Sequence, residues 1–480
     1  MSDRQHRSEG DPVYSVTDLE ARVRRAYAQD HRPWVIGYSG GKDSTCALQL
    51  IWRAIAGLPA EERQKPIFVL SSDTLVETPV IVNYIDEAIA KINQSAGKQD
   101  LPITAKKVVP DVSDSFWVNL IGRGYPAPSR RFRWCTERLK IDPANAFIKE
   151  RVAEYGEVVM VLGVRKAESA TRAQVMALHR IEGTNFSRHS SLPGAFVYTP
   201  IEELTVDDVW SYLLQTPSPW GGDNRQLLSL YRNAQAGECP LVVDKNTESC
   251  GNSRFGCWVC TVVTKDKAME AMIDNGEEWL EPLLELRDFL ADTQDPARKK
   301  EVRDFRRRNG SVTFVTGRHD PIPGPYTMPF REELLRRLLR AQKEVAADAP
   351  PGEKTVLIQD AELQEIQRIW RREAGDWGDT VHRVLGEELG RALPRPIESG
   401  FEFSDADARM LTEICEHHAL PQGMLAELLD IERSVHGLKR RASVHRRIAI
   451  TLEKEWRSEE EVLEERRQQT EAADNVRAAS

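Results

Sequence analysis

Residues 34–55 read WVIGYSGGKDSTCALQLIWRAI. The apolar run at the start predicts a strand, the two glycines at 40 and 41 predict a tight turn, and the remainder predicts a helix. Three further apolar runs, at 66–74, 103–110 and 157–165, have the length and composition of strands, and a helical pattern covers 78–93. Strands that alternate with helices predict an α/β fold, with a parallel sheet covered on both faces.

The overall composition is that of a protein with a buried core. The 480 residues include 66 Lys and Arg against 75 Asp and Glu, a formal net charge of −9, which excludes a uniformly basic surface but not a local basic patch. No apolar run reaches the length of a membrane span, and the polar N-terminus has no hydrophobic signal core. We therefore expect a cytoplasmic protein without membrane association. In such a protein, seven cysteines indicate metal ligands or reactive thiols rather than disulfides.

Changes of pattern along the chain predict four parts. Residues 17–30 fit a helix capped by Thr17, with Glu20 three positions later. Four cysteines lie within 238–264, helical patterns follow, and the chain is mostly helical from 331 to a charged tail. The expected parts are an N-terminal helical segment (1–30), the parallel-sheet domain (31–215), a cysteine-cluster region (216–330) and a helical C-terminal region (331–480).

The turn between the first strand and its helix has the features of a phosphate site. Glycines let the backbone approach a ligand, and the start of a helix presents unpaired N–H groups and a positive dipole end. A Walker-type loop is excluded, because Gly37 and Gly41 are one residue too close and Asp43 follows Lys42 where Ser or Thr is needed. The alternative is a glycine-serine turn that only caps the helix. The residues of this loop are Ser39, Gly40, Gly41, Lys42, Asp43, Ser44 and Thr45.

The SGG-x-DS pattern of this loop resembles the ATP pyrophosphatases, which cleave ATP between the α and β phosphates. Four further segments, in the same chain order, resemble one branch of that family, the phosphoadenylyl-sulfate (PAPS) reductases. They are SSDTLVET (71–78), RWCTERLKI (133–141), GVRKAESATR (163–172) and TPIEELTVDDVWSYL (199–213). The resemblance implies an adenine nucleotide α-hydrolase-like sheet domain of the HUP type that binds ATP.

The resembling segments also suggest roles for charged side chains. Arginine can hold phosphate oxygens bidentately, and a carboxylate can help to hold the Mg²⁺ that ATP cleavage needs. The alternative for each arginine is a solvated surface. Cys135 lies between Arg133 and Arg138, and cationic neighbours favour a reactive thiolate, although a buried thiol is the commoner role. The expected catalytic residues are Cys135, Asp43, Lys42 and Arg133. The expected nucleotide ligands are Ser39, Gly40, Gly41, Asp43, Ser44, Thr45, Asp73, Arg165 and Arg172. Asp43 and Asp73 are the candidate Mg²⁺ ligands.

Four cysteines, Cys239, Cys250, Cys257 and Cys260, fall within the block ECPLVVDKNTESCGNSRFGCWVCTVV. Four thiolates suit either Zn²⁺ or an iron–sulfur cluster. Structural zinc sites more often have two C-x₂-C pairs, and this block has one. Apolar residues surround that pair. Both features favour an iron–sulfur cluster over zinc. Of the other cysteines, Cys46 is expected to pack in the core, and Cys415 is expected to form no site.

The cysteine block, the loop and RWCTERLK together resemble the iron–sulfur proteins of bacterial DNA phosphorothioation, the DndC family, over essentially the whole chain. The resemblance implies a 4Fe–4S cluster on cysteines of this block, a cysteine desulfurase as sulfur donor, and other Dnd proteins as partners in a restriction-modification system. It also implies an activity, the replacement of a non-bridging oxygen of a DNA phosphate by sulfur. The redox cysteine near the C-terminus of the PAPS reductases has no counterpart after residue 454.

Positive charge is concentrated in three places, Arg130–Arg131–Arg133, Arg306–Arg308 and Lys439–Arg447. Such clusters are compatible with binding of the DNA backbone, and the alternative is a solvated helix face. Two other functions remain open. One is a PAPS reductase-like enzyme that acts on a small substrate, and the other is a DNA-binding scaffold whose nucleotide loop is only structural.

Overall fold

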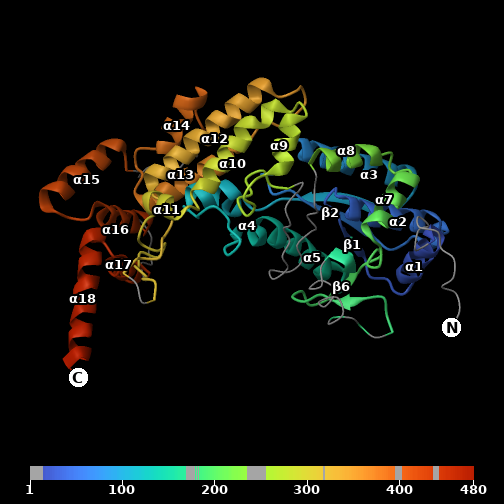
Figure 1. The fold of residues 1–480 in the computed structure, drawn as a ribbon, viewed down its shortest axis with the longest axis horizontal. Helices are drawn as coiled ribbons and strands as arrows, with labels where there is room; N and C mark the ends of the chain where they lie inside the picture. Colours follow the sequence, from blue (N-terminus) through green and yellow to red (C-terminus); the bar gives the residue numbers. More distant parts are fainter. Residues whose placement is uncertain are drawn as a thin grey trace. The chain divides into compact units, whose positions relative to one another are not determined.

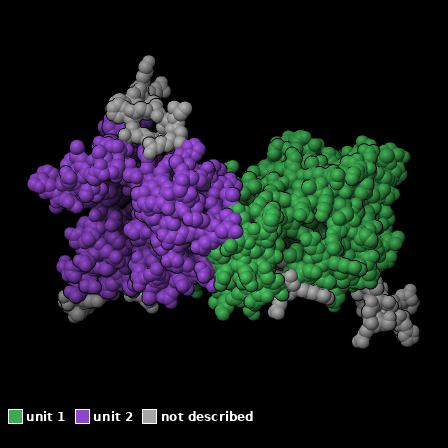
Figure 2. Space-filling model, turned by 90° about the horizontal axis from the view of Figure 1, so that it is seen from above, with its two compact units in different colours: residues 1–111, 128–284, 348–355 green, residues 112–127, 285–347, 356–480 purple. Residues whose placement is uncertain are grey.

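The computed structural model describes residues 15–168, 179, 181, 183–234, 256–316, 319–394, 403–435 and 443–479. The chain divides into two compact units (Figure 2). Unit 1 contains residues 1–111, 128–284 and 348–355, and unit 2 contains residues 112–127, 285–347 and 356–480. The two units thus alternate along the chain. The four sequential parts expected from the sequence stay a prediction.

Unit 1 is built on a six-stranded sheet with the order β3-β2-β1-β4-β6-β5. All neighbouring strands pair in parallel except β5, which pairs with β6 in the antiparallel sense. The expected α/β fold with a parallel sheet is confirmed. The strands are β1 (Trp34–Gly37), β2 (Ile67–Ser72), β3 (Ile103–Val108), β4 (Val158–Val161), β5 (Ser187–Arg188) and β6 (Ala195–Tyr198).

Helices cover both faces of this sheet (Figure 1), because successive strand residues point to opposite sides. Trp34 and Ile36 of β1 pack on one face in a core shared with α1, α2, α3 and α7. Val35 points to the other face and packs in a core shared with α5. Burial on both faces explains why these strands read as continuous apolar runs. The helices of unit 1 are α1 (Val16–Ala28), α2 (Lys42–Ala56), α3 (Pro79–Lys98), α4 (Trp134–Thr136), α5 (Asp142–Tyr155), α7 (Val206–Gln215), α8 (Asn224–Ala234) and α9 (Lys267–Asp274).

Two details of unit 1 differ from the sequence-based expectation. The first helix begins after Ser15, whose side chain makes no capping hydrogen bond, and Thr17 lies inside the helix, so the proposed cap at Thr17 is wrong. The strand β6 was not predicted. Its four residues, AFVY, are apolar and aromatic, but the run is too short to be distinguished from a loop by periodicity.

Unit 2 is helical, as expected for the C-terminal part of the chain. Its core is formed by leucines and isoleucines of α12 and α13. Two buried tryptophans donate hydrogen bonds from their ring N–H groups to backbone carbonyls: Trp117 to Leu357 at 2.8 Å and Trp370 to Ile121 at 3.0 Å. The helices are α11 (Pro296–Val302), α12 (Met328–Asp348), α13 (Asp360–Ala374), α14 (Thr380–Leu389), α15 (Asp405–His418), α16 (Gln422–Val435), α17 (Val444–Leu452) and α18 (Glu459–Ala479), after α10 (Glu281–Asp292), which begins in unit 1. In the described residues, no helix is long and apolar enough to cross a membrane.

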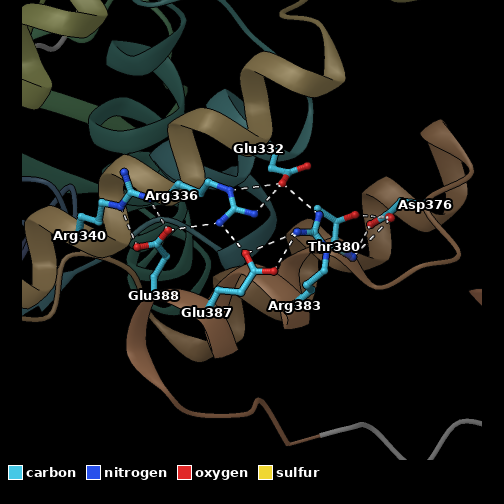
Figure 3. A network of polar contacts seen from close by, with 8 residues as sticks. All are labelled: Glu332, Arg336, Arg340, Asp376, Thr380, Arg383, Glu387 and Glu388. Carbon is cyan, nitrogen blue, oxygen red and sulfur yellow. Dashed lines mark hydrogen bonds and ion pairs between the residues drawn. The ribbon is translucent and has the colours of Figure 1, made fainter.

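A network of ion pairs joins α12 to α14 on the surface of unit 2 (Figure 3). Arg336 lies at its centre, with carboxylate oxygens of Glu332 at 2.9 Å, Glu387 at 2.6 Å and Glu388 at 3.3 Å. Arg336 thus bridges a carboxylate of α12 and two carboxylates of α14, and these contacts fix α14 against α12.

We expect Arg336→Gln to lower the stability of the protein by about 1 kcal/mol, because three contacts are lost at one partly buried side chain. The measurement is the thermal unfolding midpoint. Arg409→Gln is the control, since Arg409 makes one ion pair, with Asp405, between two exposed side chains. An equal effect of both changes would show that the network adds nothing beyond isolated surface pairs.

Candidate functional site

The loop at residues 39–45 lies at the point of the sheet where the strand order reverses. From β1 the chain proceeds to β2 and β3 on one side, and β4 then adds on the other side of β1. In open α/β sheets, ligands bind at the carboxyl ends of the strands at such a switch point. The loop follows the carboxyl end of β1, and Gly163 and Arg165 follow the carboxyl end of β4. The expected strand-turn-helix structure is confirmed.

Hydrogen bonds within the loop hold it in a closed turn. Gly40 has a positive φ of 72°, a conformation that other residues adopt rarely. The Ser44 hydroxyl donates to the carbonyl of Gly41 at 3.0 Å and accepts the N–H of Ser39 at 3.3 Å. Gly41 is the N-cap of α2 and carries no side chain. The turn therefore presents the start of α2 with little side-chain bulk, which suits an anion.

A buried charge cluster stands next to this turn. The Asp43 carboxylate accepts from Arg165 Nε at 2.5 Å and from Lys42 Nζ at 2.9 Å. All three side chains are buried, and Arg165 is only 2% exposed. Burial lowers the pKa of Lys42, although Asp43 opposes the shift. Each Asp43 oxygen thus has one cationic partner and keeps a second lone pair, and its expected role as a Mg²⁺ ligand stays a prediction.

Gly163 packs directly against the backbone of the loop. A Cβ atom at this position would lie 2.7 Å from the carbonyl oxygen of Asp43 and 2.8 Å from the nitrogen of Ser44. Only a glycine fits without moving the loop, because the atoms that it meets are backbone atoms. Two of the segments that resemble the PAPS reductases, at 39–45 and 163–172, are thus in contact.

Tyr231 of α8 is a neighbour of the loop that the sequence analysis missed. Its hydroxyl accepts the backbone N–H of Lys42 at 3.2 Å and would lie 3.1 Å from a Cβ at Gly41. The two residues are 189 positions apart, and no local pattern distinguishes this tyrosine from a packing residue.

The carboxyl end of β2 supplies a second group of polar side chains. Asp73 pairs with Lys107 Nζ at 2.9 Å and accepts the N–H of Leu75 at 2.8 Å. Leu75 has a positive φ of 64°, which is rare for a leucine and marks a constrained turn. This turn aims Thr74 and Glu77 at the cysteine block.

Cys257 packs against this turn and lies near Cys135 and Lys140 of the segment 133–141. Its thiol shares a hydrogen bond of 3.3 Å with the Thr74 hydroxyl and donates to Glu77 Oε1 at 3.6 Å. Lys140 Nζ lies 3.4 Å from the same Glu77 oxygen. Burial raises the pKa of the Cys257 thiol well above its usual value, Glu77 and Cys135 raise the pKa further, and Lys140 lowers it. Glu77 was quoted in the sequence analysis but not identified as a site residue.

The structure therefore brings Cys135 near the cysteine block, from which the sequence separates it by more than a hundred positions. Cys135 is half-buried in α4, and the Nε atom of the neighbouring Arg133 is buried with no hydrogen-bond partner in the described residues. Arg130 and Arg131, from the same basic cluster, are exposed.

The described part of the cysteine block fits adjacent metal ligands. The N–H of Cys260 donates to the carbonyl of Cys257 at 3.1 Å, so the two residues lie in one tight turn. Cys239 and Cys250 lie outside the described residues, as does Arg172. Among the residues that are described, no three His, Cys, Asp or Glu side chains form a metal-binding group. The four-cysteine cluster stays a prediction. Cys46 and Cys415 pack in cores as expected, at 1% and 4% exposure.

Residues 33–263, just under half of the chain, match the family model described as "Phosphoadenosine phosphosulfate reductase domain". The match begins at β1 and ends just after Cys260. The earlier resemblance to PAPS reductases is confirmed for this segment.

Two curated relatives are uncharacterized proteins of Methanocaldococcus jannaschii. One is 26% identical over 198 residues, which are 41% of this chain and 35% of the relative. The other is 27% identical over 177 residues, 37% of this chain and 34% of the relative. The chain thus spans about a third of the length of the curated relatives it matches.

Solved structures of similar chains include a phosphoadenylyl-sulfate (PAPS) reductase from Candida auris, which is 17% identical and aligns with 44% of this chain and 84% of its own, at a TM-score of 0.29. Another is the U34-tRNA thiolase NcsA from Methanococcus maripaludis with its 4Fe–4S cluster. It is 13% identical and aligns with 58% of this chain and 80% of its own, at a TM-score of 0.25.

Proposed function

We propose that this chain, in which residues 33–263 are a phosphoadenosine phosphosulfate reductase-like domain, uses ATP to activate a DNA backbone phosphate for replacement of an oxygen by sulfur. One observation supports the proposal above others. The glycine loop follows the carboxyl end of β1. The turn with Thr74, which contacts Cys257, follows the carboxyl end of the adjacent parallel strand β2. Neighbouring strands lie about 4.8 Å apart. A nucleotide bound on the loop and the thiol of Cys257 can therefore reach the same substrate.

The loop residues suit the first step, in which a non-bridging DNA oxygen attacks the α phosphorus of ATP. The start of α2 offers N–H groups to the phosphates, while Lys42 and Arg165 supply the positive charge that pyrophosphate needs as it leaves. Activation is needed because a phosphate oxygen is a very poor leaving group. Once adenylated, the same oxygen departs with AMP.

The second step is attack of sulfur on the activated DNA phosphorus. Hydrosulfide forms the new P–S bond, the P–O bond to AMP breaks, and the proton is released to solvent. A persulfide on Cys135 is the alternative carrier, and it requires a second thiol to break the S–S bond and a thiol reductant afterwards. A 4Fe–4S cluster on Cys239, Cys250, Cys257 and Cys260 would supply iron that binds or relays sulfur. A cysteine desulfurase and other Dnd proteins are the proposed partners.

The test is to incubate anaerobically purified protein with duplex DNA, ATP, a cysteine desulfurase, cysteine and the partner proteins. The DNA is then digested and its dinucleotides are analysed by mass spectrometry. We expect phosphorothioate-linked dinucleotides that depend on ATP. DNA without them, together with sulfite release from PAPS, would instead support a reductase that acts on a small substrate. Protein that does not bind ATP would support the other alternative, a DNA-binding scaffold whose nucleotide loop is only structural.

If Cys135 carries the sulfur as a persulfide, Cys135→Ser should lower sulfur incorporation into DNA at least about tenfold, since serine cannot form a persulfide. Iron content should stay close to that of the unmodified protein, because Cys135 lies outside the four-cysteine block. Cys415→Ala is the matched control, at a cysteine buried in unit 2. Loss of iron from Cys135→Ser would make Cys135 a cluster ligand, and full sulfur incorporation would make it a packing residue.

A further inference from the structure

Unit 2 contains a cavity of about 580 Å³ that the ATP chemistry does not use. It lies among the loop before α12, the first turn of α12, the end of α13, and helices α16 and α17 with the segment after them. Its lining includes eight Arg or Lys side chains against five Asp or Glu, a surplus of three positive charges. A protein whose net charge is −9 thus concentrates positive charge in one hollow of one unit.

Several of these cations are already neutralised by neighbours. Lys454 pairs with Glu427 at 2.6 Å, and Arg308 and Arg372 both lie near Glu373. These three resemble the arginines of the network on α12 and α14, which serve the fold (Figure 3).

Three other arginines of the cavity differ, because no carboxylate pairs with them in the part of the chain that the structure describes. Within the described residues, Arg307, Arg331 and Arg447 make no ion pair. Their guanidinium groups donate to neutral acceptors instead: Arg307 to the Pro323 carbonyl at 3.1 Å, Arg331 to the Tyr326 carbonyl at 2.6 Å and Arg447 to the Ser434 hydroxyl at 2.7 Å. Arg306 is intermediate: its Nε forms a long ion pair of 3.7 Å with Asp304 Oδ1, and this buried Nε has no hydrogen-bond partner among the described residues.

Arg331 is the buried member of this set, and a buried guanidinium group without an ion pair is costly unless an anion joins it. Burial lowers the pKa of Arg331 to about 10, although the charges of Glu373 and Asp304 oppose the shift, so the guanidinium group remains charged at neutral pH. The neutral acceptors hold the arginines in place without neutralising them. An arrangement of this kind is preorganised for a ligand that brings negative charge.

The cavity also joins two basic clusters that are distant in the sequence. Arg306 and Arg307 belong to the cluster at 306–308, and Arg447 belongs to the cluster at 439–447. A solvated helix face, the alternative reading of each cluster, does not explain why they converge on one hollow.

The shape of the cavity favours a nucleotide-sized ligand over a simple ion. Its volume is within the range of small-molecule sites, and its lining includes the aromatic side chain of Trp456. Arginine holds phosphate bidentately, which lysine cannot do. We propose that this cavity binds the phosphodiester backbone of a DNA strand, with Arg306, Arg307 and Arg447 as phosphate ligands. The phosphate chemistry follows from the cavity itself, and the identity of the strand as DNA rests on the proposed function.

The test compares two triple variants of the full chain for binding of a labelled duplex DNA by fluorescence anisotropy over a series of salt concentrations. The cavity variant carries Arg306→Gln, Arg307→Gln and Arg447→Gln. The control carries Arg337→Gln, Arg340→Gln and Arg409→Gln, which removes the same charge from unit 2 at exposed arginines outside the cavity. Arg447→Gln alone and Arg447→Lys complete the set.

Each lost phosphate contact reduces the log–log salt slope by about 0.9, so the cavity variant should have a slope smaller by about two to three and an affinity at least about tenfold weaker. Arg447→Gln alone should reduce the slope by about one, and Arg447→Lys should keep the slope but bind more weakly. The control should bind within about twofold of the unmodified protein. Circular dichroism establishes that each variant is folded.

Equal losses in the cavity variant and the control would overturn the inference, as would unmodified protein that does not bind DNA. Pyrophosphate release from ATP, measured in parallel, separates this inference from the proposed function. Protein that binds DNA through these arginines but forms no pyrophosphate would contradict the proposed function and leave the cavity assignment intact.

Discussion

Gly163→Ala should reduce pyrophosphate release from ATP at least about a hundredfold, because a displacement of about 1 Å in a catalytic loop is enough for such a loss. The added methyl group would lie 2.7 Å from the Asp43 carbonyl oxygen, closer than nonbonded carbon and oxygen atoms approach. The loop must therefore move, and the contact between Asp43 and Arg165 moves with it. The measurement is a coupled pyrophosphate assay on purified protein.

Gly97→Ala is the matched control. Gly97 lies inside α3, and a Cβ at this position meets no atom within 4 Å. Alanine should raise helix stability there by up to about 1 kcal/mol and leave pyrophosphate release unchanged. Unchanged release in Gly163→Ala would show that the loop at 39–45 does not hold the reacting phosphates.

Cys257→Ser should remove most of the iron from anaerobically purified protein, which we expect to carry about four irons per chain if the cluster is of the cubane type. Serine retains the size of the side chain and its hydrogen bond to Thr74, but it cannot replace a thiolate ligand of iron. Iron is measured by colorimetric assay and the cluster by its visible absorbance. Cys46→Ala is the control, since Cys46 is buried beside the loop, outside the cysteine block.

Iron retained in Cys257→Ser would exclude Cys257 as a cluster ligand. Zinc in place of iron in the unmodified protein, after anaerobic handling, would contradict the iron–sulfur assignment itself. Both outcomes leave the nucleotide loop untouched, so this result and the Gly163 result are independent.

The central part of the fold could be predicted from the sequence because its signals are local. In residues 34–55 a buried strand, a glycine turn and an amphipathic helix follow one another, and each has its own pattern. Strand β6 and the antiparallel β5 were missed, because two to four residues contain too little periodicity.

The candidate site was only partly predictable, for a different reason. The loop residues are contiguous and could be found, whereas the partners of the loop come from distant segments. Tyr231 contacts Lys42 across 189 positions, and Thr74 contacts Cys257 across 183. Packing of the sheet and its helices determines such contacts, and no spacing rule in one sequence reports them.

The cavity of unit 2 illustrates the same limit. The sequence identified the clusters at 306–308 and 439–447 but could not distinguish an arginine that pairs with a carboxylate from one that does not. Arg308 has Glu373 within 3.6 Å, while its neighbour Arg307 has only a carbonyl acceptor. That difference decides which residue is available to a phosphate.

The most direct test of the proposed function follows one oxygen atom. Duplex DNA labelled with ¹⁸O at its non-bridging phosphate oxygens is incubated with the complete system and ATP, and the released nucleotides are analysed by mass spectrometry. If ATP adenylates the DNA phosphate, AMP should carry ¹⁸O in proportion to the sulfur incorporated, and pyrophosphate should carry none. AMP without the label, or release of ADP and orthophosphate in place of AMP and pyrophosphate, would contradict the account.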